Sequence, residues 1–147
     1  MNFEIRRISA SETLAVRIPV LRPGFPPESA IFDGDDAPAT MHFGACAGSE
    51  VIGVASIYRV PFPDLPDAAE TWQLRGMAVM PEWQGRGVGD ALLSACVEAV
   101  RQATGLKMWC NARKGAVRFY EKHSWEILGE EFEIPTVGPH FRMWVRI

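Results

Sequence analysis

The sequence has few of the features that mark secreted, metal-binding or membrane-spanning proteins. Its three cysteines, Cys46, Cys96 and Cys110, are an odd number without C-x-x-C spacing, which favours neither a disulfide framework nor a zinc site. No apolar stretch approaches the roughly 18 residues of a membrane span, and the first residues lack the apolar core of a signal peptide. These absences predict a cytoplasmic protein with no membrane span and no metal.

The sequence also lacks a strong excess of charge. Fifteen Lys and Arg residues against 18 Asp and Glu residues give a formal net charge of −3, so there is no basic footprint for nucleic acid or an anionic membrane. With 147 residues, of which 48% are hydrophobic, the chain is long enough for one well-filled core. We therefore expect one domain over residues 1–147 and no nucleic-acid partner.

The most informative feature that is present is a glycine-rich run at residues 84–89, Q-G-R-G-V-G. It lies between an apolar strand-like stretch and a helix-like stretch. Glycines in such a turn leave backbone N–H groups unobstructed, and the positive end of the next helix adds to them, so the turn can hold a phosphate or pyrophosphate. The glycine spacing fits neither a Rossmann turn nor a Walker loop. The alternative is a tight connection that binds nothing.

The order Gln-x-x-Gly-x-Gly, preceded by Val79-Met80-Pro81, resembles the acyl-CoA pyrophosphate loop of the GNAT superfamily of N-acetyltransferases. Downstream, the segment at residues 119–125, F-Y-E-K-H-S-W, resembles the Tyr-Glu-Lys-x-Gly-Phe segment of the same family. One helix and one strand separate the two motifs, as the order of the family requires. The resemblance runs roughly from Val51 to Ile147 and is loosest in the first 40 residues.

Periodicity and breakers predict an α/β fold with the order β-α-β-β-β-α-β-α-β-β. The expected strands are residues 3–8, 41–47, 51–60, 71–79, 106–111, 125–132 and 141–147. The expected helices run from about 11 to 20, from 87 to 103 and from 116 to 123, with a loop at 61–66. A helix connects strands 71–79 and 106–111, so these two should be parallel. The resemblance implies that they splay apart within a mixed sheet.

The resemblance implies acetyl-CoA as the acyl donor. The pyrophosphate would be held by the backbone N–H groups of Gly85, Arg86, Gly87, Val88, Gly89 and Asp90, and Gln84 at the start of the same loop would also contact the cofactor. The pantetheine arm would pair with the strand edge at Met77, Ala78 and Val79, where an N–H could stabilise a developing oxyanion. A carboxylate at Asp90 is unfavourable beside phosphates unless it points away. Either Asn111 or Arg113 would contact the arm.

Two residues are candidates for the chemistry. The family places the tyrosine matched by Tyr120 beside the sulfur of coenzyme A, where its phenol can donate a proton to the departing thiolate. His140 lies in a Pro-His pair near the start of the expected last strand, beside a neighbour carrying Glu130, Glu131 and Glu133, and can serve as a base through water. The structural alternatives are a helix-end core aromatic for Tyr120 and a loop-holding histidine for His140.

The segment from residue 21 to 39 has too many prolines and glycines for regular structure throughout, and the family uses this region as part of the acceptor wall. Its charged residues, any of which could instead be solvated, are Arg22, Glu28, Asp33, Asp35 and Asp36.

These observations predict an N-acetyltransferase that moves an acetyl group from acetyl-CoA to a primary amine by direct attack. The acceptor is a small molecule or a peptide amine, and the family often forms homodimers through its C-terminal strands. The alternatives are a non-catalytic module that binds coenzyme A, an interaction domain whose glycine turn binds nothing, and transfer through a cysteine.

Overall fold

The computed structural model describes residues 2–63 and 70–147. In chain order, the strands and α-helices of these residues are β1 (Glu4–Ile8), α1 (Leu14–Leu21), β2 (Met41–Ala47), β3 (Glu50–Tyr58), β4 (Thr71–Val79), α2 (Val88–Gln102), β5 (Lys107–Arg113), α3 (Val117–Glu121), β6 (Glu126–Ile127), β7 (Phe132–Ile134) and β8 (Gly138–Arg146). Short 3-10 helices occupy Ser11–Thr13, Pro27–Ala30, Pro81–Trp83 and Lys114–Ala116.

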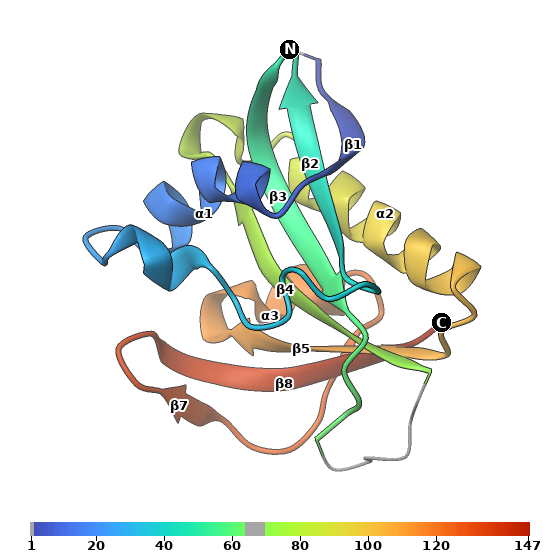
Figure 1. The fold of residues 1–147 in the computed structure, drawn as a ribbon. Helices are drawn as coiled ribbons and strands as arrows, with labels where there is room; N and C mark the ends of the chain where they lie inside the picture. The colour runs from blue at the N-terminus through green and yellow to red at the C-terminus, as the bar shows by residue number, and fades with distance from the viewer. Residues whose placement is uncertain (1, 64–69) are drawn as a thin grey trace.

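The strands form one mixed sheet in the order β1-β2-β3-β4-β5-β8-β6, with β7 also paired to β8. Among these pairs, β4 and β5 are parallel and the others are antiparallel. In Figure 1 the strands β1 to β4 lie roughly upright, whereas β5 and β8 lie across the picture, so the strand axes turn between β4 and β5. The predicted mixed α/β fold with a parallel central pair is confirmed.

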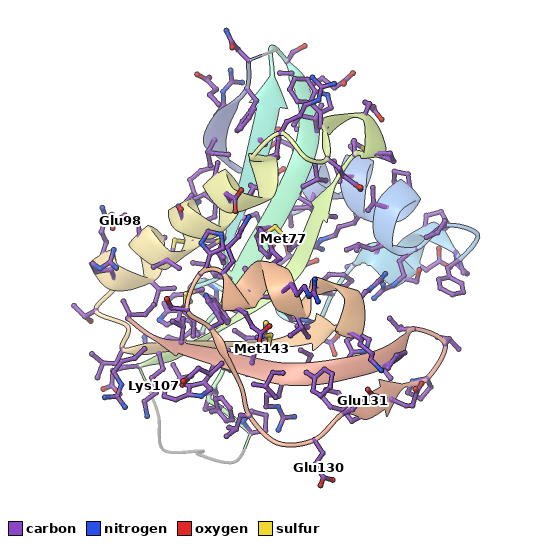
Figure 2. The ribbon with its side chains drawn as sticks, turned by 180° about the vertical axis from the view of Figure 1, so that it is seen from behind. Met77, Glu98, Lys107, Glu130, Glu131 and Met143 are labelled. Carbon is purple, nitrogen blue, oxygen red and sulfur yellow. The ribbon has the colours of Figure 1, made fainter. Side chains whose placement is uncertain are left out.

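The C-terminal part of the sheet differs from the prediction. The single strand expected at 125–132 is two short strands, because Gly129 adopts a φ of +84° and interrupts the pairing with β8. Glu130 and Glu131 therefore lie in the connection between β6 and β7, and Figure 2 shows them at the outer edge of the molecule. The last strand begins at Gly138, so His140 lies inside β8. Residues 64–66 of the expected loop lie outside the described residues.

The helices α1 and α2 pack on opposite faces of the sheet because successive residues of β3 point in opposite directions. A Cβ atom added to Gly53 would lie 2.9 Å from Val88 of α2, whereas the next residue, Val54, packs with Val16 of α1. Figure 1 shows α1 in front of β3 and α2 behind it. None of the helices in the described residues is long and apolar enough to cross a membrane.

The buried faces follow from the spacing of apolar residues. In α2 the residues Val88, Leu92, Cys96 and Val100 recur every four positions and are at most 1% exposed. This stripe covers the sheet on the side away from α1 and forms the larger core. Because α2 is anchored along its whole length, its first turn is held firmly beside the end of β4.

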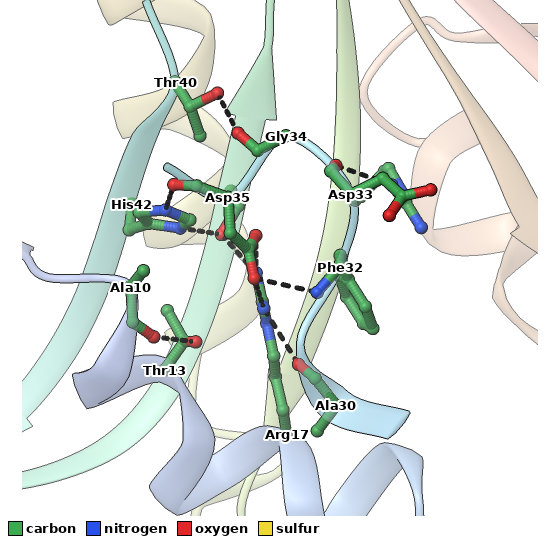
Figure 3. A network of polar contacts seen from close by, with 12 residues as sticks. Ala10, Thr13, Arg17, Ala30, Phe32, Asp33, Gly34, Asp35, Thr40 and His42 are labelled. Carbon is green, nitrogen blue, oxygen red and sulfur yellow. Dashed lines mark hydrogen bonds and ion pairs between the residues drawn. The ribbon is translucent and has the colours of Figure 1, made fainter. Parts of the chain in front are cut away.

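A charged side chain, Arg17 of α1, lies fully buried on the other face of the sheet. Its guanidinium group makes a two-point contact with the carboxylate of Asp35, with Nη1 to Oδ2 at 2.7 Å and Nη2 to Oδ1 at 3.2 Å (Figure 3). Nη1 also donates to the carbonyl of Ala30 at 3.0 Å. The pair therefore ties α1 to the segment that the sequence suggested as an acceptor wall.

Strands β2 and β3 complete this network. Arg17 Nη2 donates to Ser56 Oγ at 3.0 Å, and Ser56 Oγ lies 2.6 Å from Nδ1 of His42. His42 Nε2 lies 2.9 Å from the carbonyl oxygen of Asp35, which only accepts, so Nε2 carries the proton and Ser56 donates to Nδ1. The hydroxyl of Tyr58 accepts from Arg17 and donates to Asp35 Oδ1 at 2.5 Å. His42 is thus structural, and Asp35 is a core residue rather than an acceptor contact.

Burial alone would raise the pKa of Asp35, but hydrogen bonds from Arg17, Tyr58 and the amide of Phe32 hold it below its usual value. A carboxylate whose pKa is lower in the folded state stabilises the fold above its unfolded pKa of about 3.9, and this contribution is lost as the pH falls through the folded pKa. The free energy of unfolding should therefore fall steeply below about pH 4.

We expect Asp35→Asn to lower the free energy of unfolding at pH 7 by about 3–5 kcal/mol, because Arg17 keeps its charge in a buried site without a charged partner. Urea unfolding measures this, and the difference from the unmutated protein should shrink below pH 4. The matched control is Asp36→Asn, since the neighbouring side chain is exposed. Equal stability of the two variants would contradict the role of the buried pair.

Candidate active site

The two parallel strands separate after a short contact, and a cavity opens between them. Pairing joins Thr71–Gln73 of β4 to Lys107–Trp109 of β5 and goes no further. Beyond it lies a cavity of about 660 Å³ that touches residues 73–79 of β4 and 110–113 of β5. The end of α1, helix α3 and strand β8 supply the other walls. The predicted splaying of the central strands is therefore present.

A bulge in β4 shapes the floor of this cavity. Val54 pairs with Ala78 and Ser56 with Arg75, so β4 has one more residue than β3 between these pairs. Gly76 lies at the bulge with a φ of +68°, and a Cβ atom there would come within 3.1 Å of Phe32 and 3.2 Å of Arg17. Only glycine fits this position comfortably. This bulge was not predicted from the sequence, although an isolated glycine within a strand pattern indicates one.

The glycine-rich loop lies at the end of β4. Gly85 and Gly87 have φ values of +75° and +82°, and added Cβ atoms would meet nothing within 4 Å. Gln84 Nε2 donates to the carbonyl of Val79 at 3.0 Å and so fastens the loop to β4. Helix α2 begins directly after Gly87 without a side-chain cap. Its first amides therefore remain available for an acceptor group.

Asp90 points toward α3. Its Oδ1 lies 2.7 Å from Nε2 of His123 and 3.1 Å from Nζ of Lys122. Both hydrogen bonds lower the pKa of the carboxyl group, and the one to His123 has the larger effect. The negative charge of Asp90, which is unfavourable beside a phosphate, is thus offset by Lys122 and by the hydrogen bond to His123, both directly after α3.

Gln84 and Gly89 line the cavity, together with Met77, Ala78 and Val79 of β4. Figure 2 shows Met77 between α2 and α3. The remaining predicted loop residues, Gly85, Arg86, Gly87, Val88 and Asp90, do not line the cavity. The side chain of Val88 is 1% exposed in the core, so only its backbone can serve a ligand.

Tyr120 lines the cavity from α3 with its ring almost entirely buried. The ring packs against Phe119 and Trp125, with centroids 5.1 and 5.2 Å away. Burial raises the pKa of the phenol well above its usual value, and the neighbouring thiols of Cys110 and Cys96 add to the shift. The hydroxyl therefore keeps its proton at neutral pH and acts as a donor.

His140 and Arg113 face each other across the pairing of β8 and β5, and both line the cavity. His140 Nδ1 donates to the carbonyl of Gly138 at 2.8 Å, since that oxygen can only accept. In the neutral ring the lone pair then lies on Nε2. The ring is buried and stacks at 6.0 Å on Phe132 of β7.

Asn111 and Arg113 both lie on β5, which runs two residues further than predicted, and both line the cavity. The side-chain oxygen of Asn111 is buried and has no hydrogen-bond partner among the described residues. A buried acceptor without a partner is costly unless a ligand or water supplies a donor. This atom is the clearest sign on β5 of where a ligand N–H group would fit.

The expected acceptor wall contributes in part. Arg22 lines the cavity, and so do Phe32 and Arg75, which the sequence reading did not select. The exposed residues Glu28, Asp33 and Asp36 are not among the lining residues. Within residues 2–63 and 70–147, no group of three His, Cys, Asp or Glu side chains could hold a metal ion.

Comparisons with known proteins agree with this geometry. Residues 9–125 match the model of a family described as "Acetyltransferase (GNAT) family". The chain is 30% identical over 141 residues to "Uncharacterized N-acetyltransferase YitI" of Bacillus subtilis (strain 168), which covers 96% of this chain and 94% of that protein.

Two further similarities involve acetyltransferases of aminoglycosides. "Aminoglycoside N(6')-acetyltransferase type 1" of Stenotrophomonas maltophilia is 29% identical over 89 residues, or 60% of this chain and 58% of that protein. A crystal structure of aminoglycoside 6'-N-acetyltransferase complexed with coenzyme A has a TM-score of 0.76 at 13% identity, covering 97% of this chain and 96% of the other. The latter similarity concerns the fold alone.

Proposed function

The chain belongs to the GNAT acetyltransferase family and is an acyltransferase, and from this premise we propose that it transfers an acetyl group from acetyl-CoA to a primary amine by direct attack. The observation that carries the proposal is the cavity between β4 and β5, with the glycine-rich loop at its edge and Tyr120 and His140 in its walls. The relatives that act on aminoglycosides support a small-molecule amine as acceptor, while a peptide amine is the other option.

The residues present fit the proposed donor. The open, positive-φ glycines and the free amides at the start of α2 suit a pyrophosphate. The backbone of Met77, Ala78 and Val79, unpaired on the β5 side, suits an extended arm with amide groups. Asn111 offers its buried oxygen to an N–H group of that arm. Acetyl-CoA, when bound, supplies a thioester whose C–S bond is exchanged for the C–N bond of an amide.

Two side chains then handle protons. His140 Nε2 accepts a proton from the acceptor ammonium through water, which leaves the amine with a lone pair. The Tyr120 hydroxyl donates a hydrogen bond to the leaving sulfur. Burial raises the pKa of the phenol well above its usual value, so Tyr120 stabilises the departing thiolate and keeps its own proton. The proton that the attacking nitrogen loses as the amide forms passes to water, and the thiolate takes up a proton from water to leave as the free thiol.

Acetyl-CoA at about 100 times its Kd should add roughly 2.7 kcal/mol to the stability and raise Tm by about 5–10 °C. ATP and NAD, which carry phosphates without the arm, should produce no such shift. Thermal unfolding with each ligand measures this. No shift with millimolar acetyl-CoA would overturn the proposal, whereas binding without turnover on any amine would favour a non-catalytic module.

The loop can be tested with two matched glycine variants. Gly85 and Gly129 both have positive φ values and open space at the Cβ position, so replacement by alanine costs each about 1–2 kcal/mol of backbone strain. Only Gly85→Ala places a methyl group in the loop, and we expect it to weaken acetyl-CoA binding by about tenfold or more. Gly129→Ala should leave the affinity unchanged in the same titration.

Tyr120→Phe preserves the ring packing and removes the hydroxyl. We expect kcat to fall by about 100-fold, with the KM for acetyl-CoA almost unchanged, as measured by release of the free thiol. Because the pKa of the phenol is raised, ionisation of Tyr120 should cause no loss of rate of the unmutated enzyme up to about pH 10. If the variant is as active as the unmutated enzyme, Tyr120 is only an aromatic residue of the core.

His140→Ala should lower kcat by about 100-fold, and added imidazole should restore part of the lost rate because it can take up the same proton. If His140 only holds its strand in place, imidazole will restore nothing, and thermal unfolding of the variant will show the loss of stability instead.

A further inference from the structure

The charged side chains that line the cavity are all cationic. They are Arg22, Arg75 and Arg113, and no Asp or Glu of the described residues joins them. This runs against the formal net charge of −3 for the whole chain. A cavity with walls of one charge sign concentrates ligands of the opposite sign.

None of these three arginines pairs with a carboxylate of residues 2–63 or 70–147. Arg22 Nη1 donates to the carbonyl of Leu21 at 3.0 Å, and Arg75 Nη1 reaches the carbonyl of Asp33 at 3.5 Å. Each of these guanidinium groups therefore retains donors for a ligand. Arg17 differs, because Asp35 neutralises it.

Two of the arginines contact the same aromatic ring. The guanidinium carbons of Arg22 and Arg75 lie 5.3 and 4.8 Å from the ring centre of Phe32. Burial, followed by the charges of Arg113, Arg75 and Arg17, lowers the pKa of Arg22. The cations therefore repel one another in the free protein, and a bound anion would relieve this repulsion.

The cluster lies apart from the glycine-rich loop. Arg75 precedes Val79 by four residues, which span at most about 13 Å because the bulge at Gly76 interrupts the extended strand, and it is Val79 that the loop residue Gln84 contacts. The apolar side chains of Ile134, at the end of β7, and Val137, in the turn before β8, line the same cavity. The arginines are thus placed for a second ligand rather than for the pyrophosphate.

We propose that the amine acceptor carries an anionic group, a carboxylate or a phosphate, which Arg22 and Arg75 bind at the Phe32 side of the cavity while Arg113 adds attraction. Planar guanidinium forks match the oxygens of both groups. This inference rests on the proposed acetyltransferase function and narrows its acceptor to acidic amines. A polycationic aminoglycoside would meet repulsion at the same wall.

The test compares amines that differ only in the anionic group. L-phenylalanine is paired with 2-phenylethylamine, and O-phosphoethanolamine with ethanolamine, while kanamycin represents the polycations. We expect kcat/KM, followed by thiol release from acetyl-CoA, to be about tenfold or more higher for an acidic member than for its partner. The pair with the larger difference distinguishes carboxylate from phosphate. Preference for the members that lack the anionic group or for kanamycin, or no turnover of either acidic amine, would overturn the inference.

Arginine variants locate the contact. Arg22→Gln and Arg75→Gln should each raise the KM for the acidic amine by about tenfold, with little effect on the partner amine that lacks the anionic group or on the Tm shift caused by acetyl-CoA. The matched control is Arg101→Gln, because Arg101 is an exposed residue of α2 paired with Glu98. If both variants behave like the control, the arginines do not bind the acceptor.

The acetyltransferase function and the acidic acceptor are tested by different outcomes. Without a Tm shift from acetyl-CoA in the unmutated protein, the acetyltransferase proposal itself falls. With that shift and with turnover that favours amines without an anionic group, only the acidic acceptor is wrong.

Discussion

The buried ion pair between Arg17 and Asp35 is the interaction on which the acceptor side of the molecule depends. Taking both charges out of water is costly, and the pair is tolerable because Ser56, Tyr58 and backbone groups hydrogen-bond to it, although Arg17 Nε has no partner among the described residues. The same guanidinium group lies 4.1 Å from the ring of Phe32, which in turn stacks against two cavity arginines. A local electrostatic constraint thus fixes the position of a ring, and the ring fixes the cationic wall.

The cavity has two electropositive environments of different origin. At the glycine-rich loop the positive potential comes from backbone N–H groups and the start of α2, and it needs no charged side chain. At the other end it comes from guanidinium groups. Tyr120 and His140 line the same cavity, and both are almost entirely buried. In our proposal this arrangement orients both substrates by their charged ends and leaves the neutral reacting atoms in the middle.

The sequence predicted the order of elements, the parallel pair and the position of the loop, because these follow from local periodicity and from glycine spacing. It did not predict the bulge at Gly76 or the role of Phe32, since both depend on contacts with Arg17, which is far away in the chain. Asp35 looked like any loop carboxylate, as nothing near it in sequence reveals a buried partner 18 residues earlier. The motif resemblance began near Val51, whereas the family match begins at residue 9.

The cysteines bear on how the acetyl group travels. A relay through a thiol needs a thiolate, yet burial raises the pKa of Cys96 and Cys110 well above the ordinary value of about 8.5. Cys110 lies at the cavity wall, where Tyr120 is its partner, and a protonated phenol cannot serve as the base that a thiol would require. The same burial that keeps Tyr120 protonated for the leaving sulfur therefore keeps Cys110 unreactive, and both effects favour direct attack by the amine.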